Sequence, residues 1–369
     1  MCTKASCHSW NVGPPYFRRW TIIPPITSEP HRDLKDKVLM DSSATSAPFT
    51  ACQYGTDAEF THDPAGIANY NESVYVNFVD PVSEVSALMR IGNRPTMGYS
   101  EATVQLTLPG GRIALRAGRQ PNESNDRWST QGLDIAPRDA TRTWEVNYRN
   151  TVALISMPSL LADRGRQALK NSPSVECEIS LTFEASVPMF TIAEGGDCTP
   201  GSSQIATDHY EQFGHVSGSV QLGSTTWNID RATSFRDHSW GPREWASYTG
   251  EWLAAWLIDG TAITAYGEFE PNGERVSGGV VVTPDGVFHP IRDYTVYTDY
   301  AGEATYSGRN TSVITADGLP AMVLDGSINH FVPVTQRTAD RAARMGQMSV
   351  RYANGQGGWG IAEFLRPIK

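Results

Sequence analysis

The segment from Trp252 to Ile291, "WLAAWLIDGTAITAYGEFEPNGERVSGGVVVTPDGVFHPI", gives the clearest indication of the fold. Short apolar or alternating runs are separated by turn sequences at Asp259-Gly260, Pro271-Asn272-Gly273 and Pro284-Asp285-Gly286. Such turns join neighbouring antiparallel strands, because glycine and asparagine tolerate the positive φ angles that tight hairpins need. The segment therefore predicts four successive strands of a meander that closes into a barrel or a sandwich.

The first half of the chain shows the same pattern. In "ATVQLTLPGGRIALRAG" (102–118), apolar residues at every second position flank a Pro-Gly-Gly turn, which predicts a hairpin. Residues 215–230 predict another hairpin that turns at Gly223-Ser224, and "SLLADRGRQALK" (159–170) predicts a helix. Strands and crossover helices do not alternate, which argues against a parallel α/β fold. The expected fold is therefore mostly β, with two tandem antiparallel barrel or sandwich domains.

Composition places the expected domain boundaries. Residues 1–55 contain paired prolines and a small, polar stretch, which predicts an irregular N-terminal arm. A first β domain is expected over 56–200. The Gly/Ser/Pro-rich stretch at 193–204 marks the expected break, and a second β domain over 205–369 then contains residues 237–241, "DHSWG".

Charge and motif content exclude several function classes. The net charge of -10 argues against a nucleic-acid partner. No apolar run approaches the roughly 18 residues of a transmembrane segment, and the N-terminus lacks an apolar signal core, so a cytoplasmic location is expected. The five cysteines form no CxxC pair, and "GQGGWG" (355–360) precedes a strand rather than a helix. We therefore expect no metal and no cofactor.

One short stretch, "SFRDHSWGPREW" (234–245), combines chemistries that neither a surface turn nor a dry core needs together. It places an acid, an imidazole and a guanidinium beside two indoles at a Gly-Pro bend. In a strand, His238 and Trp240 share one face, and Asp237 faces the other way unless a bulge re-aims it. The clustering indicates a binding or catalytic site.

The meander adds further candidate residues. In "TAITAYGEFE" (261–270), Tyr266 and Glu268 share one strand face, and Trp252 and Trp256 share a face of the preceding strand. Each residue also has a structural interpretation: core packing for a tryptophan, a solvated glutamate, a hydrogen-bonded histidine. Together, an acid, an imidazole, a phenol and several indoles are typical of a pocket for an apolar small molecule.

"DHSWGPREW" followed by "AYGEFE" resembles the carotenoid 1,2-hydratase (hydroxyneurosporene synthase) family of the lipocalin-like calycin group, and more distantly the fungal lipocalin-like Diels–Alderases. The resemblance implies two tandem lipocalin-like β domains. It also implies a catalytic His-x-Trp pair, matched by His238 and Trp240, and a Tyr-x-Asp pair. Tyr266 matches the latter, with Glu268 in place of the aspartate.

These residues predict a cofactor-independent enzyme that protonates a hydrophobic polyene, isoprenoid or related natural product. Glu268 or Asp237 is the expected acid, because burial raises the pKa of a carboxyl group. His238 and Tyr266 complete the catalytic set, and hydration, cyclisation or isomerisation follows from the cation. The alternatives are a pericyclic cyclase and a non-catalytic binder of an apolar ligand. The expected substrate-binding residues are Trp240, Trp245, Trp252, Trp256 and Arg243.

Overall fold

A computed structural model describes most of the chain. The described residues are 54–191, 206, 208–243, 249–269, 275–302, 304–337, 342–353 and 357–367, without the side chains at 268, 269, 275, 276, 336, 337 and 342. Nearly all of the expected N-terminal arm and the Gly/Ser/Pro-rich stretch at 193–204 lie outside these residues.

The first sheet contains ten antiparallel strands in the order β4-β3-β2-β1-β10-β9-β8-β7-β6-β5. A further pairing of β4 with β7 joins two separated parts of this sheet. The strands are β1 (Tyr70–Asp80), β2 (Val85–Arg94), β3 (Tyr99–Leu108), β4 (Arg112–Pro121), β5 (Trp128–Thr130), β6 (Leu133–Asp139), β7 (Thr143–Ile155), β8 (Ser174–Ala185), β9 (Asp208–Leu222) and β10 (Thr225–Pro242).

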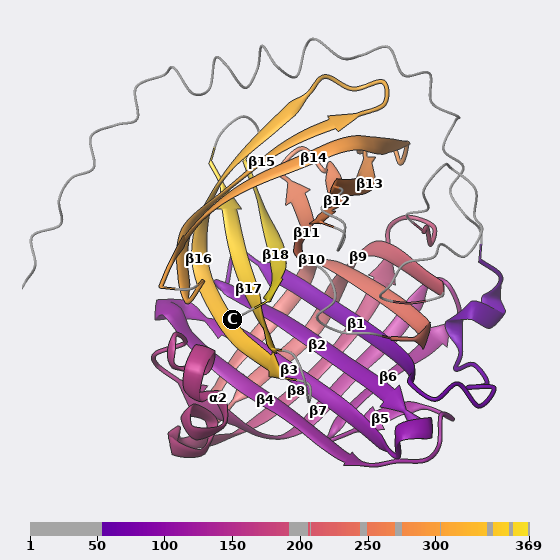
Figure 1. The fold of residues 1–369 in the computed structure, drawn as a ribbon, viewed down its shortest axis with the longest axis vertical. Coiled ribbons are helices and arrows are strands. Elements are labelled where there is room, and N and C mark those ends of the chain that lie inside the picture. Colours follow the sequence, from indigo (N-terminus) through magenta and orange to yellow (C-terminus); the bar gives the residue numbers. More distant parts are fainter. Residues whose placement is uncertain are drawn as a thin grey trace, which may run out of the picture. The chain divides into compact units, whose positions relative to one another are not determined.

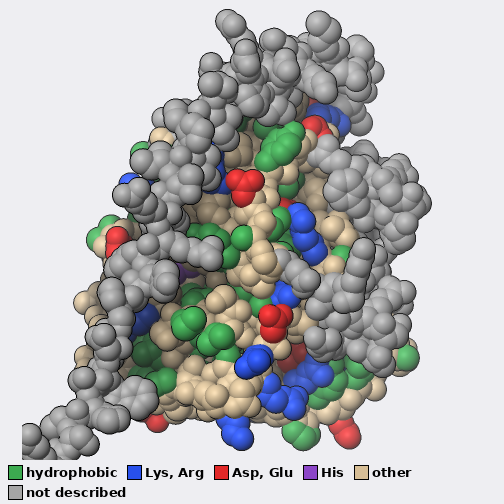
Figure 2. Space-filling view, turned by 60° about the vertical axis from the view of Figure 1, so that its left-hand side comes forward, with side chains coloured by type: hydrophobic (Ala, Val, Ile, Leu, Met, Phe, Trp, Pro, Cys, Tyr) green, Lys and Arg blue, Asp and Glu red, His purple; other side chains and the backbone are tan. Residues whose placement is uncertain are grey.

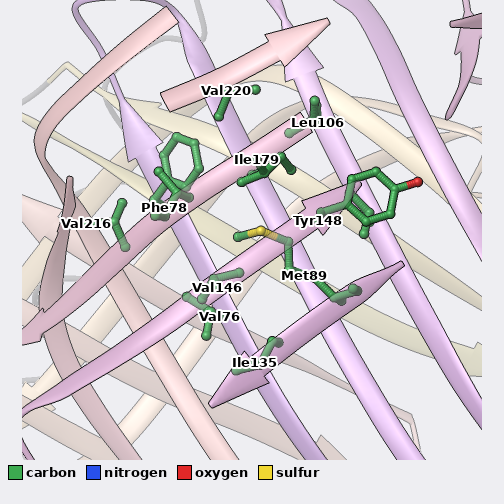
Figure 3. Packing of buried hydrophobic residues seen from close by; sticks show 14 of the residues in the cluster. Val76, Phe78, Met89, Leu106, Ile135, Val146, Tyr148, Ile179, Val216 and Val220 are labelled. Atoms are coloured by element: carbon green, nitrogen blue, oxygen red, sulfur yellow. The ribbon is translucent and has the colours of Figure 1, made fainter. Parts of the chain in front are cut away.

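Side chains from one face of these strands form the core of the first sheet (Figure 3). Val76 and Phe78 of β1 alternate with residues that point to the other face, and they pack with Met89 of β2 and Val146 of β7. The alternation follows from the strand period of two, which places every second side chain on the same face. The other face of β1, β9 and β10 is therefore left to contact the second sheet.

Strands β9 and β10 belong to the first sheet, which corrects the expected position of the "DHSWG" motif. β10 pairs with β1 along residues 233–242, and β9 pairs with β8. Figure 1 shows these two strands among the earlier strands of the chain, and the second sheet begins only at Thr249. The reason is topological: the hairpin after the expected break returns to fill the gap between β1 and β8.

The second sheet is a closed antiparallel barrel in which each strand pairs with its sequence neighbours. Its strands are β11 (Thr249–Leu257), β12 (Ala262–Phe269), β13 (Arg275–Val282), β14 (Phe288–Ala301), β15 (Tyr306–Ala316), β16 (Met322–Arg337), β17 (Ala342–Tyr352) and β18 (Gly358–Pro367). The pairing of β11 with β18 closes the barrel. The expected mostly β fold with two antiparallel sheets is confirmed.

Local expectations also hold. The hairpin of β3 and β4 turns through η3 (Pro109–Gly111), and β9 and β10 turn at residues 223–224. The expected helix is α2 (Leu160–Asn171), and two further short helices are η1 (Thr56–Glu59) and η2 (Pro95–Met97). α2 is amphipathic: Leu161 packs with Ile113 of the first sheet and Val332 of the second. The helix thus covers a contact between the two sheets.

A second contact between the sheets decides where the site lies. The side chains of Phe213 and Phe235 on the first sheet pack with Trp252, Trp256 and Ala254 on β11. The barrel contributes its outer face to this apolar layer. Its inner face is filled by a separate cluster that includes Leu253 and Ala255 of β11. We call the layer and its polar margin the junction.

Two further observations bear on binding partners. In the described part of the chain, none of the helices combines the length and the apolarity needed to cross a bilayer. On the face drawn in Figure 2, acidic and basic side chains lie interspersed over the described residues. That face therefore shows no field of a single sign.

Candidate active site at the junction

Four polar or aromatic side chains stand in a row across the first sheet. Arg90 of β2, Tyr75 of β1, Asp237 of β10 and Glu211 of β9 are successive Cα partners in neighbouring strands. Directly opposed residues project from the same face of a sheet. β10 has its register shift near residues 229–232, so Asp237 reaches this face by ordinary alternation and without a bulge of its own.

A matching row stands on the second sheet. Tyr266 of β12, Trp252 of β11, Glu363 of β18 and Gln347 of β17 are likewise successive Cα partners. Gln347 donates a hydrogen bond to Glu363 Oε1 at 3.0 Å. The barrel therefore presents a phenol, an indole, a carboxyl group and an amide side by side on its outer face.

The two rows meet across the junction. The Tyr75 hydroxyl donates to Glu363 Oε1 at 3.4 Å, and the Tyr75 and Trp252 rings lie edge to face at 6.2 Å between centroids. Phe235 packs beside Trp252 at 5.2 Å. This contact brings three carboxyl groups into one region, and we call Glu211, Asp237 and Glu363 the carboxyl cluster.

All three carboxyl groups have raised pKa values. Burial raises the pKa of Glu211 to about 8, and the charge of Asp237 adds to that shift. Burial raises the pKa of Glu363 to about 7; Asp237 again adds, while Gln347 and Tyr75 oppose. Burial also raises the pKa of Asp237 to about 7, against the positive charges of Arg243 and Arg90. The cluster therefore retains protons near neutral pH.

Asp237 has an available carboxylate. Glu211 is only 2% exposed, whereas Asp237 and Glu363 keep partial exposure. Arg243 and Arg90 lie near enough to favour the charged form of the Asp237 carboxyl group. Arg243 itself donates to Ser73 Oγ at 3.2 Å on the same face. Asp237 thus presents a partly exposed carboxyl group at the junction beside cationic side chains.

A cleft opens next to the carboxyl cluster. It is small, with a volume of about 20 Å³, and it lies between β2 and β3 of the first sheet and β17 and β18 of the barrel. Leu88, Met348 and Ile361 supply apolar walls, and Gln347, which also bonds Glu363, lies in its lining. Gln347 is therefore the residue that links the cleft to the carboxyl cluster.

His238 lies on the opposite face of β10, away from the carboxyl cluster. Its side chain is fully buried, its Nε2 lies 2.9 Å from Glu72 Oε1, and Trp128 packs edge to face at 4.9 Å. Burial would raise the pKa of Glu72, but hydrogen bonds from His238 and His62 outweigh it and hold that pKa at about 2. Successive side chains of a strand point to opposite faces, so Asp237 points to the junction and His238 points into the core of the first sheet.

A second buried network lies beside His238. Arg236 Nη2 donates to Glu59 Oε1 at 2.7 Å, and both side chains are almost fully buried. The Tyr210 hydroxyl and the Trp144 indole also donate to Glu59, and the Arg236 guanidinium lies 4.7 Å from the Trp144 ring centroid. These bonds fix η1 to β10.

The remaining expected site residues divide between the two faces. Trp240 lies on the His238 face, where it stacks on His62 at 4.0 Å. Trp256 packs edge to face on Phe213 at 5.9 Å in the apolar part of the junction. The structure thus brings Asp237, Tyr266, Trp252, Trp256 and Arg243 to the junction, places His238 and Trp240 elsewhere, and leaves Trp245 and the Glu268 side chain outside its described part.

The sequence analysis did not identify Glu211, Glu363 or Tyr75. A weak signal existed for Glu363, because it is the single charged residue in the otherwise apolar "GWGIAEFL" (358–365). Glu211 and Tyr75 stand in polar, mixed strands, and only their pairing with Asp237 distinguishes them.

Comparisons with known proteins identify relatives of this fold. A family model described as a domain of unknown function (DUF7064) matches residues 55–368. A Nitrosomonas europaea protein described as a candidate AttH has a TM-score of 0.56 at 12% identity, over 87% of this chain and 98% of its own. Kievitone hydratase from Nectria haematococca has a TM-score of 0.51 at 12% identity, over the same shares. No curated protein matches. The expected resemblance to a hydratase fold is confirmed.

Proposed function

Because the chain belongs to the DUF7064 family of domains of unknown function, we propose its activity from the junction: a cofactor-independent acid–base reaction on a hydrophobic alkene or enol ether. The observation that supports this most directly is the meeting of Glu363 and Asp237, two carboxyl groups whose charges interact, beside the Trp252 ring. Two carboxyl groups whose charges interact in a poorly solvated site titrate as a coupled pair, because the ionisation of one raises the cost of ionising the other.

Glu363 is the proposed proton donor. Its Oε1 accepts hydrogen bonds from Gln347 and Tyr75, so the protonated form places its hydrogen on Oε2. Arg90 favours the charged forms of both Asp237 and Glu363, whereas Arg243 acts on Asp237, and we therefore place the proton on Glu363. A neutral carboxylic acid in an apolar, aromatic setting is a usable acid at neutral pH.

The aromatic residues of the junction suit the cation that protonation creates. Transfer of the Oε2 proton to one alkene carbon breaks the π bond and leaves the positive charge on the other carbon, with Glu363 as a carboxylate. The Trp252 and Tyr75 rings lie next to Glu363, and a cation–π contact stabilises a cation by about 0.5–2 kcal/mol. Leu88 and Ile361 add apolar side chains beside this region.

Asp237 is the proposed base. If water attacks the cation, Asp237 accepts the released proton and the product is an alcohol. If an internal nucleophile attacks, the product is a ring, and if a neighbouring carbon loses its proton, the double bond has moved. In each case the carboxyl pair regains the proton that it donated. Kievitone hydratase, a hydratase by name, shares the fold alone and supports only that such a scaffold can host this chemistry.

The test measures solvent deuterium incorporation into a panel of isoprenoid alkenes and enol ethers in D₂O. Glu363→Gln should lower turnover by about 10²–10⁴, and ligand affinity should stay within about tenfold because the amide keeps the shape. Activity should fall as pH rises through about 7, because the donor must be protonated. Asp237→Asn should slow the hydration arm, and Asp325→Asn, on the exposed side of β16, is the matched control.

The same variants separate the rival functions. A pericyclic cyclase would incorporate no deuterium and would lose tenfold or less in Glu363→Gln. A non-catalytic binder would show no turnover in any variant and unchanged affinity. Full turnover in both Glu363→Gln and Asp237→Asn would reject the carboxyl pair as the acid and base.

A further inference from the structure

Three side chains with metal-binding atoms converge on the inner face of the first sheet. His62 Nδ1, a Glu72 carboxylate oxygen and His238 Nε2 all lie within 4.8 Å of one another. Glu72 Oε1 is 2.7 Å from His62 Nδ1 and 2.9 Å from His238 Nε2. The group lies across β10 from the carboxyl cluster and has no part in the proposed reaction.

The hydrogen bonds of His238 fix which nitrogen holds its proton. Nδ1 lies 2.9 Å from the carbonyl oxygen of Ala58, which can only accept, so Nδ1 must be the N–H donor. In a neutral imidazole the other nitrogen, Nε2, then presents a lone pair. That lone pair faces Glu72 Oε1, which is also an acceptor. The contact therefore needs either a second proton on the imidazole, so that Nε2 donates to Glu72, or a metal cation bound by the two atoms.

Glu72 Oε1 accepts a long bond from the His62 backbone N–H at 3.2 Å and otherwise faces the two imidazole nitrogens. Oε2 accepts from the backbone N–H of His62 and from the Tyr70 hydroxyl, both at 2.9 Å, and from the Asn125 amide. The three donors on Oε2 and the Ala58 carbonyl on His238 orient the carboxylate and the imidazole. Such supporting bonds usually accompany histidine and carboxylate metal ligands.

We propose that His62 Nδ1, Glu72 Oε1 and His238 Nε2 bind one divalent transition-metal cation of the zinc class. Two imidazole nitrogens and one carboxylate oxygen suit Zn²⁺, Co²⁺ or Fe²⁺ better than Ca²⁺ or Mg²⁺, which prefer oxygen ligands. Metal bonds of about 2.0–2.1 Å in a tetrahedral site separate the ligand atoms by about 3.3 Å. The present contacts must therefore widen by about half an ångström.

The fourth position faces the margin of the sheet. The His62 side chain is 27% exposed, whereas those of Glu72 and His238 are fully buried, so the ion would enter past His62 and keep a water ligand there. Trp240 stacks on the His62 ring and holds it in place. The bound ion would fasten the segment that precedes β1 to β10, which is a stabilising role.

The experiment titrates the chelator-treated full-length protein with Zn²⁺ in a calorimeter and with Co²⁺ in a spectrophotometer. We expect the protein to bind one equivalent of Zn²⁺ with a Kd of about 1 µM or tighter and to have a higher Tm with Zn²⁺. Bound Co²⁺ should show the visible absorption of an ion with four or five ligands. His62→Ala should weaken binding at least about 100-fold and abolish the Tm increase. His289→Ala removes a histidine from β14 instead and should change neither.

Two results would overturn the proposal. The first is that the wild-type protein binds Zn²⁺ no more tightly than His62→Ala does. The three residues would then form only a hydrogen-bonded His–Glu group. The other is one-equivalent binding that His62→Ala leaves unchanged. Glu72→Gln gives a further test if it folds, and His62→Ala decides alone if it does not, since His62 is partly exposed. The chelated protein should retain any junction activity, because none of the three ligands belongs to the carboxyl cluster.

Discussion

Replacing Glu211 with glutamine should flatten the pH dependence of stability. The Glu211 pKa is about 8 in the folded protein, against an ordinary value of 4.5 that the unfolded chain is expected to show. Between these values the folded protein holds a proton that the unfolded chain releases. The free energy of unfolding therefore falls by about 1.4 kcal/mol for each unit by which pH rises through this window.

The proton on Glu211 contributes up to about 5 kcal/mol to the free energy of unfolding over this interval of about 3.5 pH units. The contribution is fully present below pH 4.5 and is lost by about pH 8. Glutamine does not titrate, so the free energy of unfolding of Glu211→Gln should rise relative to that of the wild type as pH rises. The difference should grow by about 1.4 kcal/mol per pH unit, the slope for one proton. Asp237 and Glu363 still titrate in both proteins, so only the difference between the curves isolates Glu211.

Urea unfolding at half-unit steps from pH 5 to pH 9 measures this difference. Glu101→Gln is a control of opposite sign: Arg90, Arg94 and Arg119 outweigh its burial and lower its pKa, so its effect should change only in the acid range. Parallel curves for Glu211→Gln and the wild type would refute the argument that Glu211 is held protonated at the junction.

Three further outcomes are expected. Glu59→Gln should cost about 3–5 kcal/mol of unfolding free energy in urea, because it leaves the Arg236 guanidinium buried without its carboxylate; a loss below about 1 kcal/mol would contradict this. Gly278→Ala should displace Tyr266, since a Cβ there would lie 2.7 Å from the Tyr266 hydroxyl oxygen, and a crystal structure with an unmoved ring would disprove it. Trp252→Ala should lower ligand affinity at the junction more than Trp240→Ala does, as measured by calorimetry, because only Trp252 lies beside Glu363.

Local sequence signals were enough to predict the strands, the hairpins and α2. Period-two alternation and Gly-containing turns act over a few residues, and the barrel joins sequence neighbours except where β11 pairs with β18. Alternation also placed Asp237 and His238 on opposite faces correctly. The partners of Asp237 could not be predicted in this way, because the pairing of β10 with β1 joins distant parts of the chain and depends on which sheet has an open edge. The composition of residues 193–204 suggested a break there, but strand pairing decided that β9 and β10 complete the first sheet.

The register of β10 limits which insertions and deletions the chain can tolerate. Arg236 and His238 point into the first sheet, and Asp237 between them points to the junction. An added or lost residue between the register shift at 229–232 and Asp237 would exchange these faces, placing a carboxylate in the core and an imidazole at the junction. The same change at the Gly223-Ser224 turn, before the shift, would alter only the hairpin tip. Length variation among sequences of this family should therefore be found at the turn and be absent from 233–242.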